Sequence, residues 1–496
     1  MGLKPTAGPT PKAELRRAFP QCFRTHTSLS HARNDVGGTR GVTMVVMDGA
    51  VQCMAVPLGA ATFQAYAGVV YRGIRDAMSA GQIVIVTFDE PEVTSNAKKL
   101  EQVRRDAASK KRKVVQCSSD LATAPPNAAF DSSDIRRMED VHTLKQFRPA
   151  RAKLFDEIGL EVLRRATTVV RQWKENGHEA GALILDGVDS RGANRRPDEP
   201  RNPVMIGTDE ETLACFKRDL RIGEGDLKLG AHEQRLRELQ KEGRQPFADM
   251  RLVQHATIDS DALAIGVLDV ARRRVADTAD TADTADTADT ADTESESKPP
   301  EPAVASALHA LVCMRERRAS DAWADETATY TTVDMAQLEA ALQAHMWGVS
   351  KWSPTPHQLL QSALAWVAGT VMCGCDFVAL KGSNFPHTME ALPSFVKTEH
   401  AALARLAATL QDTDEKALVA AAGVRTLCCA ISAHMAEVPR YGRQSALLRE
   451  AEDDILRKVV WTLSYWCGRE RVADARWGFS VVGAASAAAE SAAAES

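Results

Sequence analysis

The amino-acid sequence predicts an α/β protein whose core is a parallel β-sheet flanked by helices. Four short, apolar and often β-branched runs are typical of strands buried on both faces, at residues 42–47, 83–88, 182–185 and 253–258. Long helical patterns separate these runs, for example at residues 61–77 and 152–173. Strands that alternate with helices along a chain indicate a parallel sheet with crossover helices.

The composition is that of a globular protein and excludes several classes of function. The chain has 496 residues, of which 44% are hydrophobic and 26% charged, with a formal net charge of −5. This balance excludes a uniformly basic nucleic-acid coat protein, and an aromatic content of 5% argues against a sheet that stacks bases. We expect no membrane partner, because the sequence lacks both a secretory signal and any apolar run of about 18 residues.

The cysteines favour a reduced, intracellular protein. None of the ten belongs to a C-x-x-C pair, and their spacing forms no ordered disulfide framework. Cys373 and Cys375 lie close together, but two soft ligands are too few to favour a zinc site. The sequence does not decide between nucleus and cytoplasm.

A low-complexity segment divides the chain. Residues 276–293 are six copies of Ala-Asp-Thr, and a polar, proline-containing stretch continues to residue 302. Because such a segment has little to bury, we expect residues 276–302 to be a disordered linker. It would separate an α/β core at residues 1–275 from a mostly helical region at 303–480, which a low-complexity tail follows at 481–496.

Acidic residues follow every predicted strand. They are Asp48, Asp89 with Glu90, Asp186, and Asp259 with Asp261. Because ligands of open parallel sheets bind beyond the carboxyl ends of the strands, we expect these acids to meet at one edge. Their mutual repulsion would be relieved by a divalent cation, and oxygen ligands suit Mg²⁺ or Mn²⁺. The alternative for any single aspartate is an ordinary turn residue, but acids at four strand ends out of four favour a cluster.

Two further motifs add acidic residues. The stretch RIGEGDLKL places Glu224 and Asp226 two residues apart in a glycine-rich turn, and MCGCDF places Asp376 after an apolar helical run. Acidic capping of a helix N-terminus is the alternative interpretation of the first motif.

A basic helix is predicted directly after the second acidic strand, at residues 96–113. Its cations include Lys98, Lys99, Arg104, Arg105, Lys110 and Lys111. Lys98 and Arg105 share one helical face. Cations beside an acidic metal site are what a phosphodiester substrate requires, although a solvated charged face is the alternative.

In their order, these motifs resemble those of the flap endonuclease / 5′→3′ exonuclease superfamily, which has a PIN-like core and includes flap endonucleases and 5′→3′ exoribonucleases. MVVMDGA and VTFDEP resemble its first two metal-binding elements, and RIGEGDLKL resembles the Gly-Glu-Gly-Glu-His-Lys motif of the exoribonucleases. TIDSDAL resembles a Thr-x-Asp-x-Asp element, and GCDFVALKGSNFPHTMEAL resembles the flap-endonuclease element that runs into a helix-turn-helix.

The resemblance implies a fold, a cofactor and roles for named residues. The fold would be a PIN-like parallel sheet with a mostly helical C-terminal region that completes the active site. Two Mg²⁺ or Mn²⁺ ions would be held by Asp48, Asp89, Glu224, Asp226, Asp259, Asp261 and Asp376, with Asp186 as a peripheral acid. Lys98 and Arg105 would contact the scissile phosphate. Other nucleic-acid contacts would come from Lys99, Arg104, Lys110, Lys111 and Gly382.

The implied function is a metal-dependent 5′-nuclease that cleaves DNA by a two-metal-ion mechanism. The exoribonuclease-like motif leaves RNA open as a substrate, but the flap-endonuclease-like match is longer and favours DNA. A catalytically inactive PIN-like scaffold that binds nucleic acid or protein is the alternative from another class. Protein partners cannot be inferred.

Overall fold

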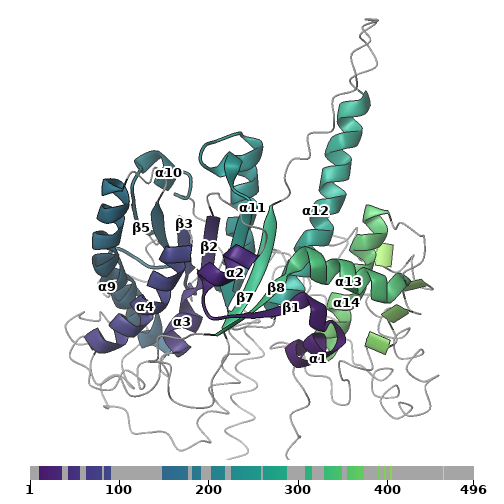
Figure 1. Ribbon diagram of the computed structural model, residues 1–496, viewed down its shortest axis with the longest axis horizontal. Coiled ribbons are helices and arrows are strands. Elements are labelled where there is room, and N and C mark those ends of the chain that lie inside the picture. The colour runs from purple at the N-terminus through teal and green to yellow at the C-terminus, as the bar shows by residue number, and fades with distance from the viewer. Residues whose placement is uncertain are drawn as a thin grey trace, which may run out of the picture.

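The computed structural model has an α/β architecture built on one mixed sheet (Figure 1). It describes residues 11–35, 43–55, 63–80, 83–90, 148–176, 181–191, 203–217, 225–257, 261–286, 308–315, 329–348 and 355–373, with scattered positions between 389 and 462. Within these residues the sheet has eight strands in the order β1-β8-β7-β6-β2-β3-β4-β5.

The four predicted strands are confirmed, and they lie side by side in parallel. They are β2 (Thr43–Asp48), β3 (Ile83–Thr87), β4 (Ala182–Asp186) and β6 (Leu252–Thr257). Every residue in them is buried. This burial on both faces explains why their sequences are continuous apolar runs rather than alternating ones.

Four further strands complete the sheet. Strand β7 (His309–Arg315) pairs in parallel with β6, and β8 (Tyr330–Asp334) pairs antiparallel with β7. Strand β1 (Phe23–His26) and strand β5 (Val204–Gly207) are antiparallel strands at the two edges. Strands β7 and β8 follow the Ala-Asp-Thr repeat, so the region predicted to be mostly helical also contributes two strands to the same sheet.

Two long helices cover one face of the sheet. They are α4 (Phe63–Ala80) and α9 (Arg148–Glu175), which confirm the helices predicted at 61–77 and 152–173. The shorter α2 (Leu29–Asp35) packs beside them. Their apolar residues join the side chains of β2, β3 and β4 that point to this face in a single buried cluster.

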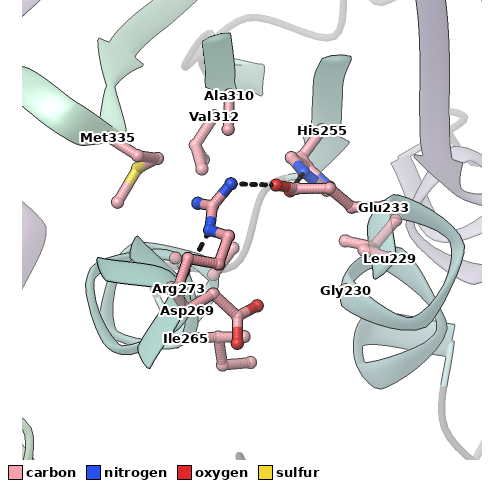
Figure 2. Close-up of a pocket in the computed structure, with 12 residues that line it drawn as sticks. Leu229, Gly230, Glu233, His255, Ile265, Asp269, Arg273, Ala310, Val312 and Met335 are labelled. Atoms are coloured by element: carbon pink, nitrogen blue, oxygen red, sulfur yellow. Dashed lines mark hydrogen bonds and ion pairs between the residues drawn. The ribbon is translucent and has the colours of Figure 1, made fainter. Parts of the chain in front are cut away.

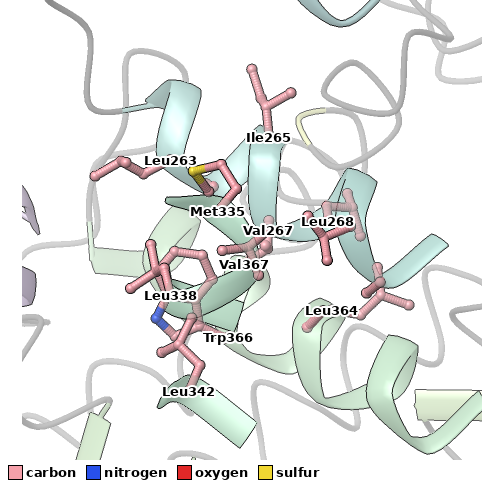
Figure 3. Close-up of a cluster of buried hydrophobic side chains, with 14 of the residues drawn as sticks. Leu263, Ile265, Val267, Leu268, Met335, Leu338, Leu342, Leu364, Trp366 and Val367 are labelled. Carbon is pink, nitrogen blue, oxygen red and sulfur yellow. The ribbon is translucent and has the colours of Figure 1, made fainter. Parts of the chain in front are cut away.

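The opposite face is covered by two groups of helices. Over β2, β3 and β4 lie α10 (Glu210–Ala214) and α11 (Gly225–Lys241), with the short 3₁₀ helix η3 (Phe247–Asp249). Over β7 and β8 lie α12 (Asp261–Asp286), α13 (Met335–Trp347) and α14 (Pro356–Cys373), joined by α1 (Pro11–Ala18). Figure 3 shows Leu268, Leu338 and Trp366 from α12, α13 and α14 in this second core.

Helix α12 corrects one prediction about the repeat. It continues to Asp286, so the first copies of Ala-Asp-Thr are helical rather than disordered. Alanine has the highest helix propensity, and a helix that the buried segment from Leu263 to Ala271 has already nucleated extends at little cost. Residues 287–302 lie outside the described residues.

No helix in the described part of the chain combines the length and the apolar character needed to cross a membrane.

Candidate functional site

Polar side chains form a row across the carboxyl ends of four adjacent strands. Asp48 is in register with Thr87, and Thr87 is in register with Asp186. The pairing of β2 with β6 brings Thr257 to the same level. Residues in register on parallel strands point to the same face, and here that face is the one under α11.

The row lies where the order of the strands reverses. Along the chain, β2, β3 and β4 step across the sheet in one direction, whereas β6 and β7 extend it from the other side of β2. Ligands of open α/β sheets bind in the crevice beyond the carboxyl ends of the strands at such a reversal. Asp48, on β2, therefore lies at the position where this fold class binds its ligands.

Asp48 is buried and also begins a helix. Its side chain is at the end of β2, and its Oδ1 accepts a hydrogen bond of 3.0 Å from the backbone N–H of Val51 in α3 (Gly49–Ala55). This is the geometry of an N-cap, in which a carboxylate satisfies one of the open N–H groups of the first helical turn.

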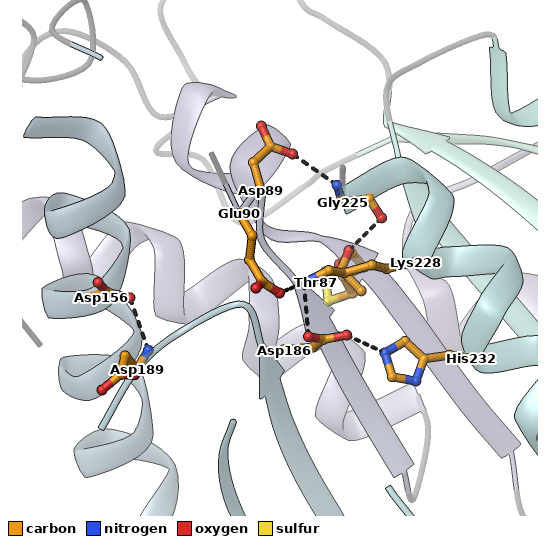
Figure 4. Close-up of polar contacts among 10 residues, drawn as sticks. Thr87, Asp89, Glu90, Asp156, Asp186, Asp189, Gly225, Lys228 and His232 are labelled. Atoms are coloured by element: carbon orange, nitrogen blue, oxygen red, sulfur yellow. Dashed lines mark hydrogen bonds and ion pairs between the residues drawn. The ribbon is translucent and has the colours of Figure 1, made fainter. Parts of the chain in front are cut away.

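Asp89 fixes the start of α11 (Figure 4). Its Oδ1 accepts a hydrogen bond of 2.9 Å from the backbone N–H of Gly225, and the hydroxyl of Thr87 lies 3.0 Å from the carbonyl oxygen of the same glycine. A Cβ atom at Gly225 would lie 3.3 to 3.5 Å from these two side chains and from the Thr87 carbonyl. Glycine therefore permits the close approach of α11 to the end of β3.

A buried lysine lies inside the acidic edge, contrary to the expectation that only a metal would neutralise it. The ammonium of Lys228 on α11 contacts a carboxylate oxygen of Glu90 and lies 2.9 Å from Asp186 Oδ1. His232, one turn later, lies 2.7 Å from Asp186 Oδ2 through its Nε2. The Lys228 side chain has 0% exposure.

Asp186 and Lys228 stay ionised despite their burial because each lies beside opposite charge. Burial alone would raise the pKa of Asp186, but Lys228 and His232 bring it below its ordinary value. Burial alone would likewise lower the pKa of Lys228, but Asp186 and Glu90 raise it above its ordinary value. Asp186 is therefore an ionised partner of a lysine.

A second buried charged cluster lies between α11, α12 and β6 (Figure 2). Glu233 accepts a hydrogen bond of 2.7 Å from Arg273, and its other oxygen lies 2.6 Å from His255 Nε2. Arg237 donates a further hydrogen bond of 2.8 Å to Glu233. Burial alone would raise the pKa of Glu233, but His255 and Arg237 lower it below its ordinary value. The cavity beside this cluster measures about 20 Å³, which suits a single water molecule and is too small for an organic substrate.

The structure describes part of the predicted ligand set. Asp48 and Asp89 lie at the ends of neighbouring strands, and Asp261 is the first residue of α12, the helix that follows β6. Asp226 is in the first turn of α11, but its side chain lies outside the described residues. Also outside them are Glu224, Asp259, Asp376, Lys98, Lys99, Arg104, Arg105, Lys110, Lys111 and Gly382. Among the residues that are described, no group of three or more His, Cys, Asp or Glu side chains could hold a metal ion.

The buried basic residues of α11 and β6 were not predicted from the sequence. Lys228 and His232 are four residues apart, so they share one face of the helix. That face also carries apolar residues such as Leu236. A lysine and a histidine on the apolar face of a helix could have predicted this cluster, because buried cations need acidic partners.

Comparison with known proteins adds no assignment, since no family model and no curated protein matches this chain.

Proposed function

We propose that this protein is a metal-dependent 5′-nuclease with a PIN-like core, which hydrolyses phosphodiester bonds of DNA. The observation that carries the proposal is the position of Asp48 and Asp89. Asp48 ends β2 and Asp89 follows the adjacent parallel strand β3, at the reversal of strand order, and Asp261 begins the helix after β6, on the other side of β2. Acids at the ends of adjacent strands, in the place where open α/β sheets bind their ligands, support a divalent-cation site that acids outside the described residues would complete.

The side chains at this edge fit Mg²⁺ or Mn²⁺ in their chemistry. Asp48 and Asp89 offer hard carboxylate oxygens, and each accepts one hydrogen bond from a backbone N–H group. In the proposed site Glu224, Asp226, Asp259, Asp261 and Asp376 complete the ligand set. When bound, the two ions would supply an activated water and a counter-charge for the leaving oxygen.

The proposed substrate contacts come from the basic helix. Lys98 and Arg105 are assigned to the scissile phosphate, and Lys99, Arg104, Lys110 and Lys111 to neighbouring phosphates, with Gly382 in a turn that contacts the nucleic-acid backbone. DNA is proposed rather than RNA because the longer of the two discriminating sequence motifs is the flap-endonuclease-like one.

The test is cleavage of end-labelled DNA and RNA, with and without a 5′ phosphate, in Mg²⁺ and in chelator. Asp48→Asn and Asp89→Asn should each lower Mg²⁺-dependent cleavage at least about 100-fold, because ligands are more sensitive than their outer-shell partners. Asp209→Asn is the matched control. Asp209 also caps a helix after a strand, where it accepts a 2.7 Å hydrogen bond from the backbone N–H of Thr212. Because it follows the antiparallel β5, it lies near the amino ends of the parallel strands, away from the acidic edge. Full cleavage by Asp48→Asn, or cleavage in chelator, would refute the proposal.

An inactive scaffold is the second candidate, and Lys228 is the observation that favours it. A lysine already neutralises Glu90 and Asp186 at one end of the edge. A scaffold of this kind would not gain thermal stability from Mg²⁺ or Mn²⁺, whereas a folded-state metal site raises Tm as the ion concentration increases. Titration of either ion during thermal melting separates the two candidates.

A further inference from the structure

A buried ammonium lies at one end of the acidic edge. At the end formed by β3 and β4, both oxygens of Asp186 have cationic or ring N–H partners, because Lys228 contacts Oδ1 at 2.9 Å and His232 contacts Oδ2 at 2.7 Å. Lys228 also contacts Glu90. At the end formed by β2 and β3, Asp48 and Asp89 accept hydrogen bonds from backbone N–H groups.

A fixed ammonium and a divalent ion compete for the same carboxylates. The Lys228 side chain has 0% exposure, so solvent screens its charge little. A second cation placed on Asp186 or Glu90 would meet this charge at short range in a medium of low dielectric constant, where like charges repel strongly. The lysine therefore makes the β3–β4 end a poor site for Mg²⁺ or Mn²⁺.

The same lysine ties a helix to the sheet. Lys228 lies in the first turn of α11, three residues after Gly225, which Asp89 and Thr87 hold at the end of β3. Figure 4 shows these contacts from the strand ends to one helical turn. Losing the ion pairs of Lys228 would loosen the turn that Asp89 contacts.

We propose that Lys228 is the resident cation of the β3–β4 end, and that Asp186 and Glu90 dock α11 through it rather than bind a divalent metal. Lys228 is then a positioning residue, which sets the first turn of α11 against Asp89. The statement about metal binding rests on the proposed function, whereas the docking role does not.

The docking role is tested by thermal melting of the full chain in chelator. Lys228→Met removes the ammonium that the buried Asp186 and the half-buried Glu90 both contact, and should lower Tm by roughly 5–10 °C. The double variant Lys228→Met with Asp186→Asn should melt no lower than Lys228→Met alone, because one unpaired charge has been removed. Lys241→Met, at the exposed end of the same helix, is the control and should change Tm little. Strictly additive losses in the double variant would overturn the docking role.

Metal binding is tested by Mn²⁺ titration followed by electron paramagnetic resonance. Asp186→Asn and Glu90→Gln should bind the same number of Mn²⁺ ions as the wild type, whereas Asp48→Asn and Asp89→Asn should bind fewer. Lys228→Met should gain Mn²⁺ binding and recover part of its lost Tm, a rescue that a purely structural lysine would not give. A tenfold weaker Mn²⁺ affinity in Asp186→Asn would overturn the inference even if Lys228→Met fails to fold.

If the wild type binds no Mn²⁺, the proposed function fails instead, and the melting series alone decides the role of Lys228.

Discussion

The pKa values of two carboxyls, Glu233 on α11 and Asp269 on α12, are shifted in opposite directions, although burial by itself would raise both. Glu233 has cationic partners on two elements and stays ionised. Asp269, one helix away, has a more distant cation, since Arg272 Nη1 lies 3.9 Å from its Oδ1. Burial, and then the negative charge of Glu233, raise the pKa of Asp269 to about 6. The two acids therefore respond differently to pH although they line the same small cavity.

Asp269→Asn should stabilise the protein at neutral pH. A carboxyl with a folded-state pKa near 6 and an ordinary value of 3.8 releases its proton first in the unfolded state. The wild-type free energy of unfolding therefore falls as pH rises from about 4 to 6 and is constant above that range. The asparagine variant lacks this loss. The difference between pKa values of 3.8 and about 6 is equivalent to about 3 kcal/mol, and solvent screening of a side chain that is 29% exposed should reduce the advantage to about 1 to 2 kcal/mol. Urea denaturation at a series of pH values measures it.

Asp35→Asn is the control of opposite sign. The pKa of Asp35 is lowered by its hydrogen bond with Arg24, which is 2.6 Å long. The wild type should therefore be the more stable protein above about pH 4, and the difference should vanish in acid. A flat difference between Asp269→Asn and the wild type from pH 4 to 7 would contradict the raised pKa of Asp269.

At this scale the sequence predicted the places of two acids at strand ends but not two buried cations on α11. Asp48 and Asp89 were found because a parallel strand ends in a predictable place and its next residues face the ligand edge. The roles of Lys228 and His232 were not predicted, because they depend on which strand α11 covers. The sequence of a helix alone does not determine the strand on which that helix packs. Their buried acidic partners are 42 and 46 residues away in the chain.

At the scale of elements, the turn after β4 depends on a glycine. Gly187 has a φ of +88°, and a Cβ atom there would lie 2.4 Å from the carbonyl oxygen of Phe88. The backbone N–H of Phe88 also donates a 2.7 Å hydrogen bond to the carbonyl of Asp186. The two strands therefore stay close beyond their last paired residues, directly behind the acidic edge.

Gly187→Ala should lower the free energy of unfolding by about 3 kcal/mol or more, from left-handed strain plus the clash with the Phe88 backbone. Gly243→Ala isolates the first of these effects. Gly243 also has a positive φ, +65°, but nothing lies within 4 Å of its added Cβ atom, so the cost should be about 1 kcal/mol. Urea denaturation of both variants measures the difference. Equal losses would show that the close approach at Phe88 relaxes without cost.

Strands were predicted correctly where burial on both faces produces a continuous apolar run in the sequence. Strands β2, β3, β4 and β6 are buried on both faces, so each is an unbroken apolar run. Strand β7 was missed because its apolar centre is flanked by His309 and Arg315 and lies near a low-complexity repeat. The repeat itself was expected to be disordered from composition alone, and composition does not register that a helix already formed can extend into it.

At the scale of the whole molecule, the sheet joins parts of the chain that composition separates. Strand β7 pairs with the whole of β6, from Leu252 to Thr257, although the repeat lies between the two strands in the sequence. Helix α12, before residue 287, packs on α13 and α14, after residue 334. The second core therefore contains residues from both sides of the repeat, and neither side buries its apolar surface by itself.

A chain that ends at residue 302 should consequently fail to fold cooperatively. It would keep β2, β3, β4 and β6 but lose β7, β8, α13 and α14, which leaves the β6 edge unpaired and exposes Leu263, Val267 and Leu268 of α12. Circular dichroism during urea denaturation should show a broad, non-cooperative transition for residues 1–302, and co-expression with residues 303–496 should restore a single sharp one. A matched truncation at residue 480 removes only the low-complexity tail and should unfold like the full chain. If residues 1–302 unfold cooperatively at the midpoint of the full chain, then β7 and β8 are an appendage to a core that is already complete at β6.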